Sequence, residues 1–321
     1  MSETYDSSVV RPAQGAFNMM THSQVLMVFL FVGCAGSSLT GDSTWHSKHG
    51  WHSDDFFDDP RLVTLCKAIE AGEAGAVRKM LDGGVDPNSV GKSGVTLLLW
   101  AFPGEEKDCF NILLDAGADP DTRITERIGR GKMNTGGTCV TVLAARYGSA
   151  AIFRRVLESG ADPNAKQHYM ERTLVHVILT EFFVPQREEK LHILLEYGPD
   201  LNVFSAMDET PAMAAVSRGN PEMALAILNG GADPNIFQPR SPQKLIHFVA
   251  REVEIRDAQW KHDHHDALRE LIAKLEANGD SLDKATEDIR RWSEIGRNYP
   301  PLEGRKILDQ EMARIRGETE E

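Results

Sequence analysis

The chain has 321 residues, of which 41% are hydrophobic and 26% are charged. This composition is typical of globular proteins with enough apolar residues for a sizeable core. Its 35 Lys and Arg stand against 48 Asp and Glu, a formal net charge of −13. Such a surface repels a phosphate backbone, whose binding needs basic contacts, so nucleic acid is excluded as the expected partner.

The N-terminal region contains one apolar run, residues 25–32, which is too short for a bilayer span of about 20 residues. The run fits the apolar centre of a signal peptide, and Phe31-Val32-Gly33-Cys34 resembles the lipobox of bacterial lipoproteins. The resemblance implies a signal peptide over residues 1–33 and a lipid anchor on Cys34. It implies a bacterial cell-envelope protein, and Ala35 resembles the second residue of outer-membrane lipoproteins that face the periplasm. The alternative is a cytoplasmic protein with a merely hydrophobic N-terminal segment.

Between this cysteine and the folded body, the sequence predicts a flexible tether. Residues 34–59 are rich in Gly, Ser, Asp and His and show no sustained helical or strand period. From Pro60 onward, apolar residues recur at helical spacing, which indicates a mostly α-helical body. The later cysteines, Cys66, Cys109 and Cys139, are too scattered for a disulfide framework or a CxxC metal site, so we expect buried core residues.

One short phrase recurs along the body. Its five copies are Gly84–Asn88, Gly117–Asp121, Gly160–Asn164, Gly198–Asn202 and Gly231–Asn235. The glycines are 33, 43, 38 and 33 residues apart, a 33-residue period with insertions of 10 and 5, and a weaker copy begins at Gly279. In each copy we expect the glycine to close a helix and Asp-Pro-Asn to turn the chain outward. The repeated aspartates are therefore predicted to hold the fold rather than to carry chemistry.

A 33-residue unit of this turn, two antiparallel helices and a Thr-Pro-Leu-His-x-Ala opening resembles the ankyrin repeat. The clearest opening is Thr210–Ala215, after which Asn220 is expected to cap a second helix and Pro221 to take its first position. Looser openings begin at Thr96, Thr173 and Lys244. The resemblance covers residues 60–282 and implies an all-α solenoid of five to six helix-turn-helix units. It also implies a protein-binding scaffold, which we expect to be monomeric, with a concave face of first helices and turn fingers.

The final segment, residues 283–321, is highly charged but keeps an apolar subset. Its members are Ile289, Trp292, Ile295, Ile307, Leu308, Met312 and Ile315. Asn298-Tyr299-Pro300-Pro301 interrupts the pattern, which predicts two short helices joined by a turn. We expect these helices to cap the open end of the stack. The alternative is a separate partner-binding helix pair.

Candidate partner-binding residues lie in the fingers and at the ends of the first helices. The finger over residues 121–137 is enlarged and basic, with Arg123, Arg127, Arg130 and Lys132 against Glu126. It either contacts an acidic partner surface or lipid phosphates, or is a solvated hairpin. Aromatic side chains dominate binding energy at interfaces. Those expected near the groove are Tyr147, Tyr169, Phe182, Phe183 and Phe204, with Trp100 and Phe102 either there or in the core. Arg146, Arg218 and Arg251, at first-helix ends, complete the predicted surface.

Motifs for catalysis or cofactor binding are missing from the sequence, which has no nucleophile elbow, HExxH pair or phosphate-binding glycine loop. We therefore expect neither an enzyme nor a cofactor. Two histidine groups invite a metal hypothesis, because imidazole suits Zn, Cu and Ni. They are His46, His49 and His52, and His262, His264 and His265 beside Asp263 and Asp266. A solvated polar face is the favoured interpretation, and a metal-handling or enzyme-accessory protein is the alternative. His176 and His247 occupy the ankyrin repeat's usual His position, which implies a structural role.

Overall fold

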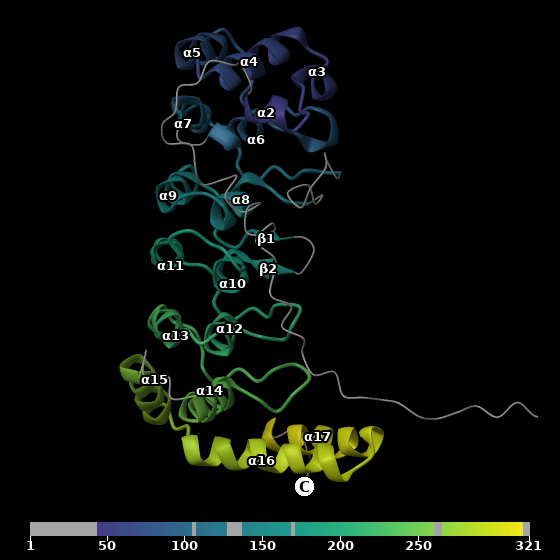
Figure 1. Cartoon of the computed structure of the whole chain (residues 1–321), viewed down its shortest axis with the longest axis vertical. Coiled ribbons are helices and arrows are strands. Elements are labelled where there is room, and N and C mark those ends of the chain that lie inside the picture. Colours follow the sequence, from purple (N-terminus) through teal and green to yellow (C-terminus); the bar gives the residue numbers. More distant parts are fainter. Residues whose placement is uncertain (1–43, 105–106, 127–136, 168–170, 260–264, 317–321) are drawn as a thin grey trace, which may run out of the picture. The chain divides into compact units, whose positions relative to one another are not determined.

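The computed structural model describes residues 44–104, 107–126, 137–167, 171–259 and 265–316. These residues belong to one compact unit that begins at Asp42, and helices stacked in pairs dominate it (Figure 1). The predicted all-α solenoid is confirmed. The predicted signal peptide, Cys34 and the first part of the tether lie outside the described residues. Within the described ranges, no helix has both the length and the apolar character needed to cross a membrane.

The described helix pairs form two layers, which Figure 1 shows as adjacent columns with the turn fingers projecting on the inner side. The inner layer holds the first helix of each unit: α4 (Pro60–Ala71), α6 (Leu97–Ala101), α8 (Val140–Arg146), α10 (Leu174–Thr180), α12 (Pro211–Ser217) and α14 (Leu245–Gln259). The outer layer holds the second: α5 (Ala74–Asp82), α7 (Asp108–Asp115), α9 (Ala150–Glu158), α11 (Arg187–Glu196), α13 (Pro221–Asn229) and α15 (His265–Ala277). The fingers contain the 3-10 turn η1 (Lys92–Gly94) and an antiparallel pair, β1 (Lys166–Gln167) and β2 (Arg172–Thr173).

The helix starts of the clearest unit follow its sequence signals with one exception. The Thr210 hydroxyl accepts a hydrogen bond from the Met213 amide at 3.4 Å and caps α12. Pro221 takes the first position of α13, as predicted. Asn220 occupies the N-cap position, but its side chain does not cap the helix, and its Nδ2 donates to the Arg218 carbonyl at 3.3 Å instead. The backbone of Asn220, at φ −117° and ψ 70°, is not extended, which explains the difference.

The repeated turn phrase joins neighbouring units through a ladder of hydrogen bonds. Its helix-closing glycines have positive φ at Gly84, Gly117, Gly160, Gly198, Gly231 and Gly279. Within each of the five turns, the aspartate Oδ1 accepts a bond from the amide two residues further on. Between turns, the side chain that ends one phrase accepts a bond from the aspartate amide of the next. These linking side chains belong to Asn88, Asp121, Asn164 and Asn202. The structural role predicted for the repeated acids is confirmed.

The core lies between the two layers. The predicted burial of the three cysteines is confirmed, and it raises the pKa of each thiol, so they are packing residues rather than nucleophiles. Of the leucines that precede the turn glycines, Leu114, Leu157 and Leu228 are buried, whereas Leu81 and Leu195 are only half-buried.

One buried cation ties two units together. Lys190 on α11 is fully buried, and its ammonium donates to the carbonyls of Ala144 at 3.1 Å and Ala145 at 3.0 Å. These carbonyls belong to the last turn of α8, where helical carbonyls run short of donors, although Ala144 also accepts from the Gly148 amide at 3.1 Å. A positive charge there also complements the helix dipole.

Residues 44–59 differ from the flexible tether that their composition predicts. They contain α2 (Trp45–Lys48) and α3 (Ser53–Phe56). His46, Trp51 and Phe57 are buried. The composition is misleading here because a few aromatic side chains that pack on the repeats leave no periodic pattern in so short a segment.

The chain ends in two longer helices, α16 (Leu282–Asn298) and α17 (Pro301–Arg316). α16 packs on α14 and buries Trp292, whose ring lies 4.9 Å from that of His247. In Figure 1, α8 to α14 are seen nearly end-on, whereas α16 runs across the end of the stack. α17 packs on α16 and leaves Leu302 83% exposed.

Candidate partner-binding surface

The inner face of the first two units is covered by the chain's own residues 44–57. The His46 ring stacks on Trp100 with the ring centroids 4.5 Å apart, and its Nε2 donates to the Trp100 carbonyl at 2.8 Å. The Trp100 indole N–H donates to Glu70 at 3.1 Å, and Trp100 is fully buried. Of the two aromatics that the sequence placed either in the groove or in the core, Trp100 lies beneath this cover and Phe102 is core, packed edge-on against Phe110.

The C-terminal ends of α8, α10 and α12 form a continuous feature that we call the rim, residues 146–147, 181–183 and 217–218. Arg146 forms an ion pair with Glu181 at 2.8 Å, and its guanidinium lies 4.9 Å from the centre of the Tyr147 ring. The rim thus contains five of the predicted site residues, Arg146, Tyr147, Phe182, Phe183 and Arg218. Their equivalent positions in consecutive units bring them together.

Two ion pairs span the inner helices α10 and α12, with the acidic and basic residues in opposite order in the two units. On α10, Arg172 before the helix binds Glu181 after it at 3.3 Å. On α12, Glu209 before the helix binds Arg218 after it at 3.1 Å. Both carboxylates are only 14% exposed, so these pairs are partly desolvated. Arg146 and Arg218 are therefore held in place by the chain itself. The nine-residue spacing of these pairs was a sequence signal that the prediction missed.

Two exposed phenylalanines stand at the centre of the rim. The side chains of Phe182 and Phe183 are 80% and 49% exposed and form an edge-to-face pair with centroids 4.7 Å apart. They lie in the α10–α11 connection, which has six residues, 181–186, where the equivalent α8–α9 and α12–α13 connections have three. The extra residues account for most of the five-residue insertion in this unit. The apolar pair therefore belongs to an addition that neighbouring units do without.

The connection that carries this pair is anchored at its end. The Arg187 guanidinium donates to the Glu181 carbonyl at 2.5 Å, and burial lowers the pKa of Arg187. Gln186, in the left-handed conformation at φ 50°, accepts a bond from the Ala150 amide at 2.9 Å and so caps α9 of the preceding unit. The phenylalanines are thus presented from a fixed loop.

The basic finger is only partly described. Arg123 is exposed, and its guanidinium donates to the carbonyls of Gly137 at 2.7 Å and Lys166 at 3.0 Å. It joins two consecutive fingers. Arg127, Arg130 and Lys132 lie outside the described residues.

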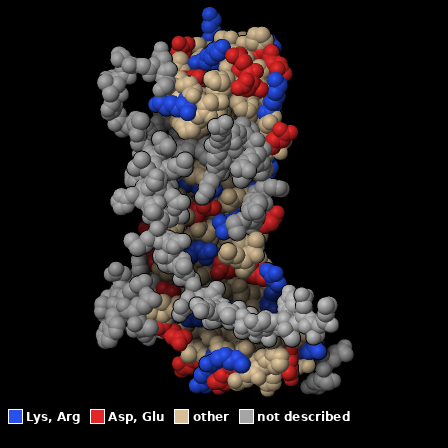
Figure 2. Space-filling view, turned by 45° about the vertical axis from the view of Figure 1, so that its right-hand side comes forward, with Lys and Arg blue, Asp and Glu red and all other residues tan. Residues whose placement is uncertain are grey.

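The remaining candidates are scattered. Phe204 is half-buried in the finger before α12, Arg251 is exposed on α14, and Tyr169 lies outside the described residues. Met207, which the sequence did not single out, is 55% exposed in the same finger as Phe204. Figure 2, which brings the finger side forward, shows acidic and basic side chains intermixed among the described residues.

The histidines of the repeats have the structural role that the resemblance implied. His176 is fully buried, accepts from the Thr173 hydroxyl through Nδ1 at 2.9 Å and donates through Nε2 to the Glu209 carbonyl at 3.0 Å. It thereby links α10 to the next finger. His247 Nδ1 accepts from the Lys244 amide at 3.0 Å. Burial lowers the pKa of both histidines.

The histidines of the metal hypothesis have different surroundings in the structure. His46 is committed to Trp100, and His52 is exposed. His262 and His264 lie outside the described residues, while His265 begins α15. Among the described residues, no three His, Cys, Asp or Glu side chains are placed to share a metal ion.

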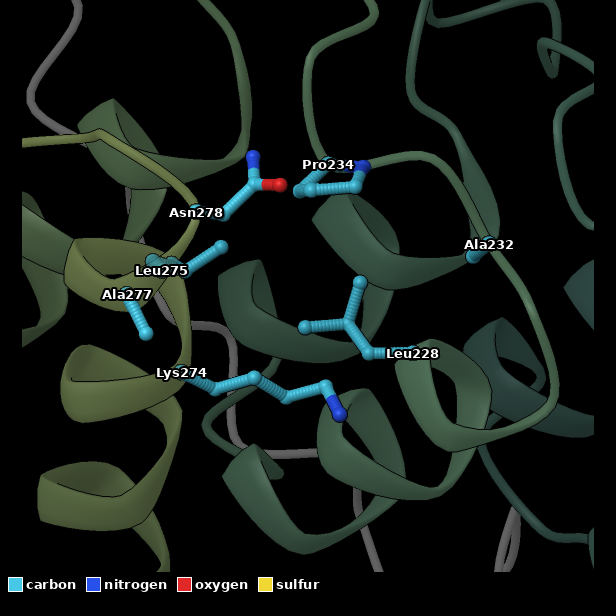
Figure 3. Close-up of a pocket in the computed structure, with 7 residues that line it drawn as sticks. All are labelled: Leu228, Ala232, Pro234, Lys274, Leu275, Ala277 and Asn278. Carbon is cyan, nitrogen blue, oxygen red and sulfur yellow. The ribbon is translucent and has the colours of Figure 1, made fainter.

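The described surface has hollows between its helices. One, of about 290 Å³, lies between α13 and α15 (Figure 3). Leu228, Pro234 and Leu275 make its walls largely apolar, and the Lys274 ammonium beside it donates to Asn229 Oδ1 at 2.8 Å. Another, of about 420 Å³, lies between α2 and the first two units. Neither hollow gathers a catalytic set of side chains.

Comparisons with known proteins agree with this architecture. A family model described as ankyrin repeats in three copies matches residues 141–238. The chain is also 27% identical over 194 residues to the ankyrin repeat and KH domain-containing protein mask-1 of Caenorhabditis elegans. That similarity covers 54% of this chain but only 7% of the relative's length.

Proposed function

Because this chain is an ankyrin-repeat protein, and ankyrin repeats are generally protein-protein interaction modules, we propose that it is a non-catalytic scaffold. It binds a partner protein through the rim and the neighbouring fingers of the inner face. The surface residues, rather than the fold, determine which partner the scaffold binds.

The exposed Phe182–Phe183 pair carries this proposal. Single exposed apolar residues are ordinary, but two adjacent phenylalanines presented together mark a contact site more specifically. The repeat does not need them, since its neighbours close the same connection with three residues. Aromatic side chains are also the type that most often anchors protein interfaces.

The surroundings of the pair favour tight and selective binding. Arg187 and Gln186 fix the connection before any partner arrives, which lowers the ordering cost of association. The flanking Arg146–Glu181 and Arg218–Glu209 pairs present both signs of charge. Mixed charges of this kind select a partner with a matching pattern more than they add affinity.

We propose further that the scaffold is a monomer anchored to the bacterial cell envelope through lipidated Cys34, facing the periplasm from the outer membrane. The lipobox-like Phe31–Cys34 segment supports this location. Metabolic labelling with a radioactive fatty acid tests it. Wild type should take up label and fractionate with membranes, and Cys34→Ala should do neither. Unlabelled wild type in the cytoplasmic fraction would favour the cytoplasmic alternative.

The proposed surface is tested by crosslinked affinity capture from native cells, with wild type compared with Phe182→Ser/Phe183→Ser. The matched control is Leu302→Ser, which removes an equally exposed apolar side chain from α17. Wild type and the control should enrich the same partner, and the double variant should lose it. Equal capture by all three chains would rule out the rim. A further chain with Arg127, Arg130 and Lys132 changed to Ser tests the basic finger separately.

A further inference from the structure

Residues 44–57, which we call the N-terminal cover, pack on the inner face of the first two units. Glu70 joins the cover to both units, because it accepts bonds from the Trp100 indole at 3.1 Å and from the Thr44 hydroxyl at 3.4 Å. Trp51 and Phe56 complete an aromatic cluster around Trp100, with centroids 5.7 and 5.8 Å away. The contacts thus span α4 and α6.

Trp100 has no aromatic counterpart in the next three units, although Phe248 takes the equivalent position in the unit of α14. Trp100 stands four residues after the capping residue of its helix, where the next three units have Leu143, Val177 and Ala214. Among the units of α6, α8, α10 and α12, the aromatic side chain at this position occurs only where the cover lies. Trp100 and the aromatic residues of the cover pack as one cluster.

The cover is joined to the repeats differently from the way repeats are joined to each other. Besides the turn ladder, neighbouring fingers share a backbone–backbone hydrogen bond from the Thr125 amide to the Ser93 carbonyl at 2.9 Å. In the described part of the chain, no backbone–backbone hydrogen bond links residues 44–57 to the repeats. Side chains make the link, through His46, Thr44 and the aromatic cluster.

The position of the cover also differs from that of a terminal cap. A cap covers the open end of a stack, as α16 does at the other end. Residues 44–57 instead run along the inner face, from Trp100 on α6 to the finger at Gly91, where Phe57 packs. Beside α2 the surface has an open hollow of about 420 Å³, lined by Trp45, Glu70 and Lys107 among others.

We propose that residues 44–57 are an intramolecular ligand of the inner face of the first two units. Its release uncovers a docking site around Trp100 and Glu70 for an aromatic-rich peptide segment of another protein. The inference goes beyond the proposed function, because it concerns α4 and α6 rather than the rim and does not depend on a partner at the rim.

The experiment uses the full chain and a fluorescein-labelled peptide with the sequence of Thr44–Asp59 as the probe. In wild type the linked cover competes at an effective concentration of about millimolar, so the peptide should bind poorly. In His46→Ala/Trp51→Ala the cover lacks its two central contacts. Fluorescence anisotropy should then show the peptide binding about tenfold or more tightly than to wild type.

Three controls define the outcome. His52→Ala changes an exposed histidine of the same segment and should behave as wild type. A peptide with Ala in place of Trp51 should not bind the released variant. Hydrogen exchange of residues 44–57 should rise in His46→Ala/Trp51→Ala and, less, in the milder His46→Gln, with the later units unchanged.

The proposal requires that the repeats stay folded without the cover. Unfolding of the first two units in either variant, seen by circular dichroism and hydrogen exchange, would overturn it, because the cover would then be a structural part. A folded variant that does not bind the peptide would also overturn it. Loss of partner capture by the Phe182–Phe183 variant bears only on the rim.

Discussion

The covered inner face of α4 and α6 contrasts with the rim at the ends of α8, α10 and α12. At the first, aromatic side chains are abundant but buried by the chain's own residues 44–57, around Trp100. At the second, the aromatic pair Phe182–Phe183 is exposed and fixed on a loop. Both surfaces are built on the same repeat. The contrast teaches that a solenoid's binding capacity is set by what lies on each unit, because every unit supplies a similar scaffold.

The largest change in the free energy of unfolding should follow from truncating Trp100, at the centre of the covered face. Trp100→Ala is expected to lower the free energy of unfolding by about 3–5 kcal/mol, because a fully buried indole leaves a cavity. Urea unfolding of the full chain measures the change. A loss below about 1 kcal/mol would mean that the covered face contributes little to the fold.

The link between α8 and α11 should come next. Lys190→Met is expected to cost about 1–3 kcal/mol, because it removes the ammonium that donates to the carbonyls of Ala144 and Ala145, and only Ala144 keeps a second donor, the Gly148 amide. Urea unfolding is again the measurement. Lys274→Met is the control, since its bond to Asn229 is on the surface, and should stay within about 0.5 kcal/mol of wild type. Equal effects of the two changes would show that Lys190 does not tie the units beneath the rim.

The turn ladder runs past both regions and should show a smaller effect. Asn164→Ala removes the acceptor for the Asp200 amide and should cost about 1 kcal/mol by thermal unfolding. Asn164→Asp should restore most of this loss, because Asp121 makes the equivalent bond in the preceding turn. Failure of the aspartate to restore stability would mean that the amide group has a further role.

Acidification should affect both regions through buried histidines. Burial lowers the pKa of His46 beneath the cover and of His176 on α10, so the folded chain binds protons less readily than the unfolded chain. Stability is therefore complete above the unfolded pKa of about 6.5 and falls as the pH drops below it. Urea unfolding between pH 7.5 and 5 measures the slope, which should be shallower in His46→Gln and His176→Gln. An unchanged slope in both variants would show that His46 and His176 do not cause the loss of stability at low pH.

The smallest effect is expected at the rim. Phe182→Ser/Phe183→Ser should change the free energy of unfolding by less than about 0.5 kcal/mol per residue, because both side chains already face solvent. Thermal unfolding of the purified double variant checks this. A large loss would show that the pair packs against the fold and would remove the main support for the rim as a binding site.

Much of the architecture was predictable, and the missed features share a cause. The turn phrase and its 33-residue period predicted the units because each copy reports a local requirement, a left-handed glycine and a side-chain acceptor. The cover was missed because its few aromatic contacts are long-range. For the same reason, the sequence did not predict that Arg123 links two fingers through the carbonyls of Gly137 and Lys166.

The amino-acid sequence determined the repeat, the helix-closing turns and the buried cysteines, since each depends on neighbours within one 33-residue unit. Tertiary structure decided which aromatic side chains are available: it buries Trp100 under residues 44–57 and leaves Phe182 and Phe183 in solvent. It also pairs Arg146 with Glu181, two residues of different units. Exposure and ion pairing depend on segments that are distant along the chain and come into contact only when the units stack. A local sequence pattern therefore cannot predict them.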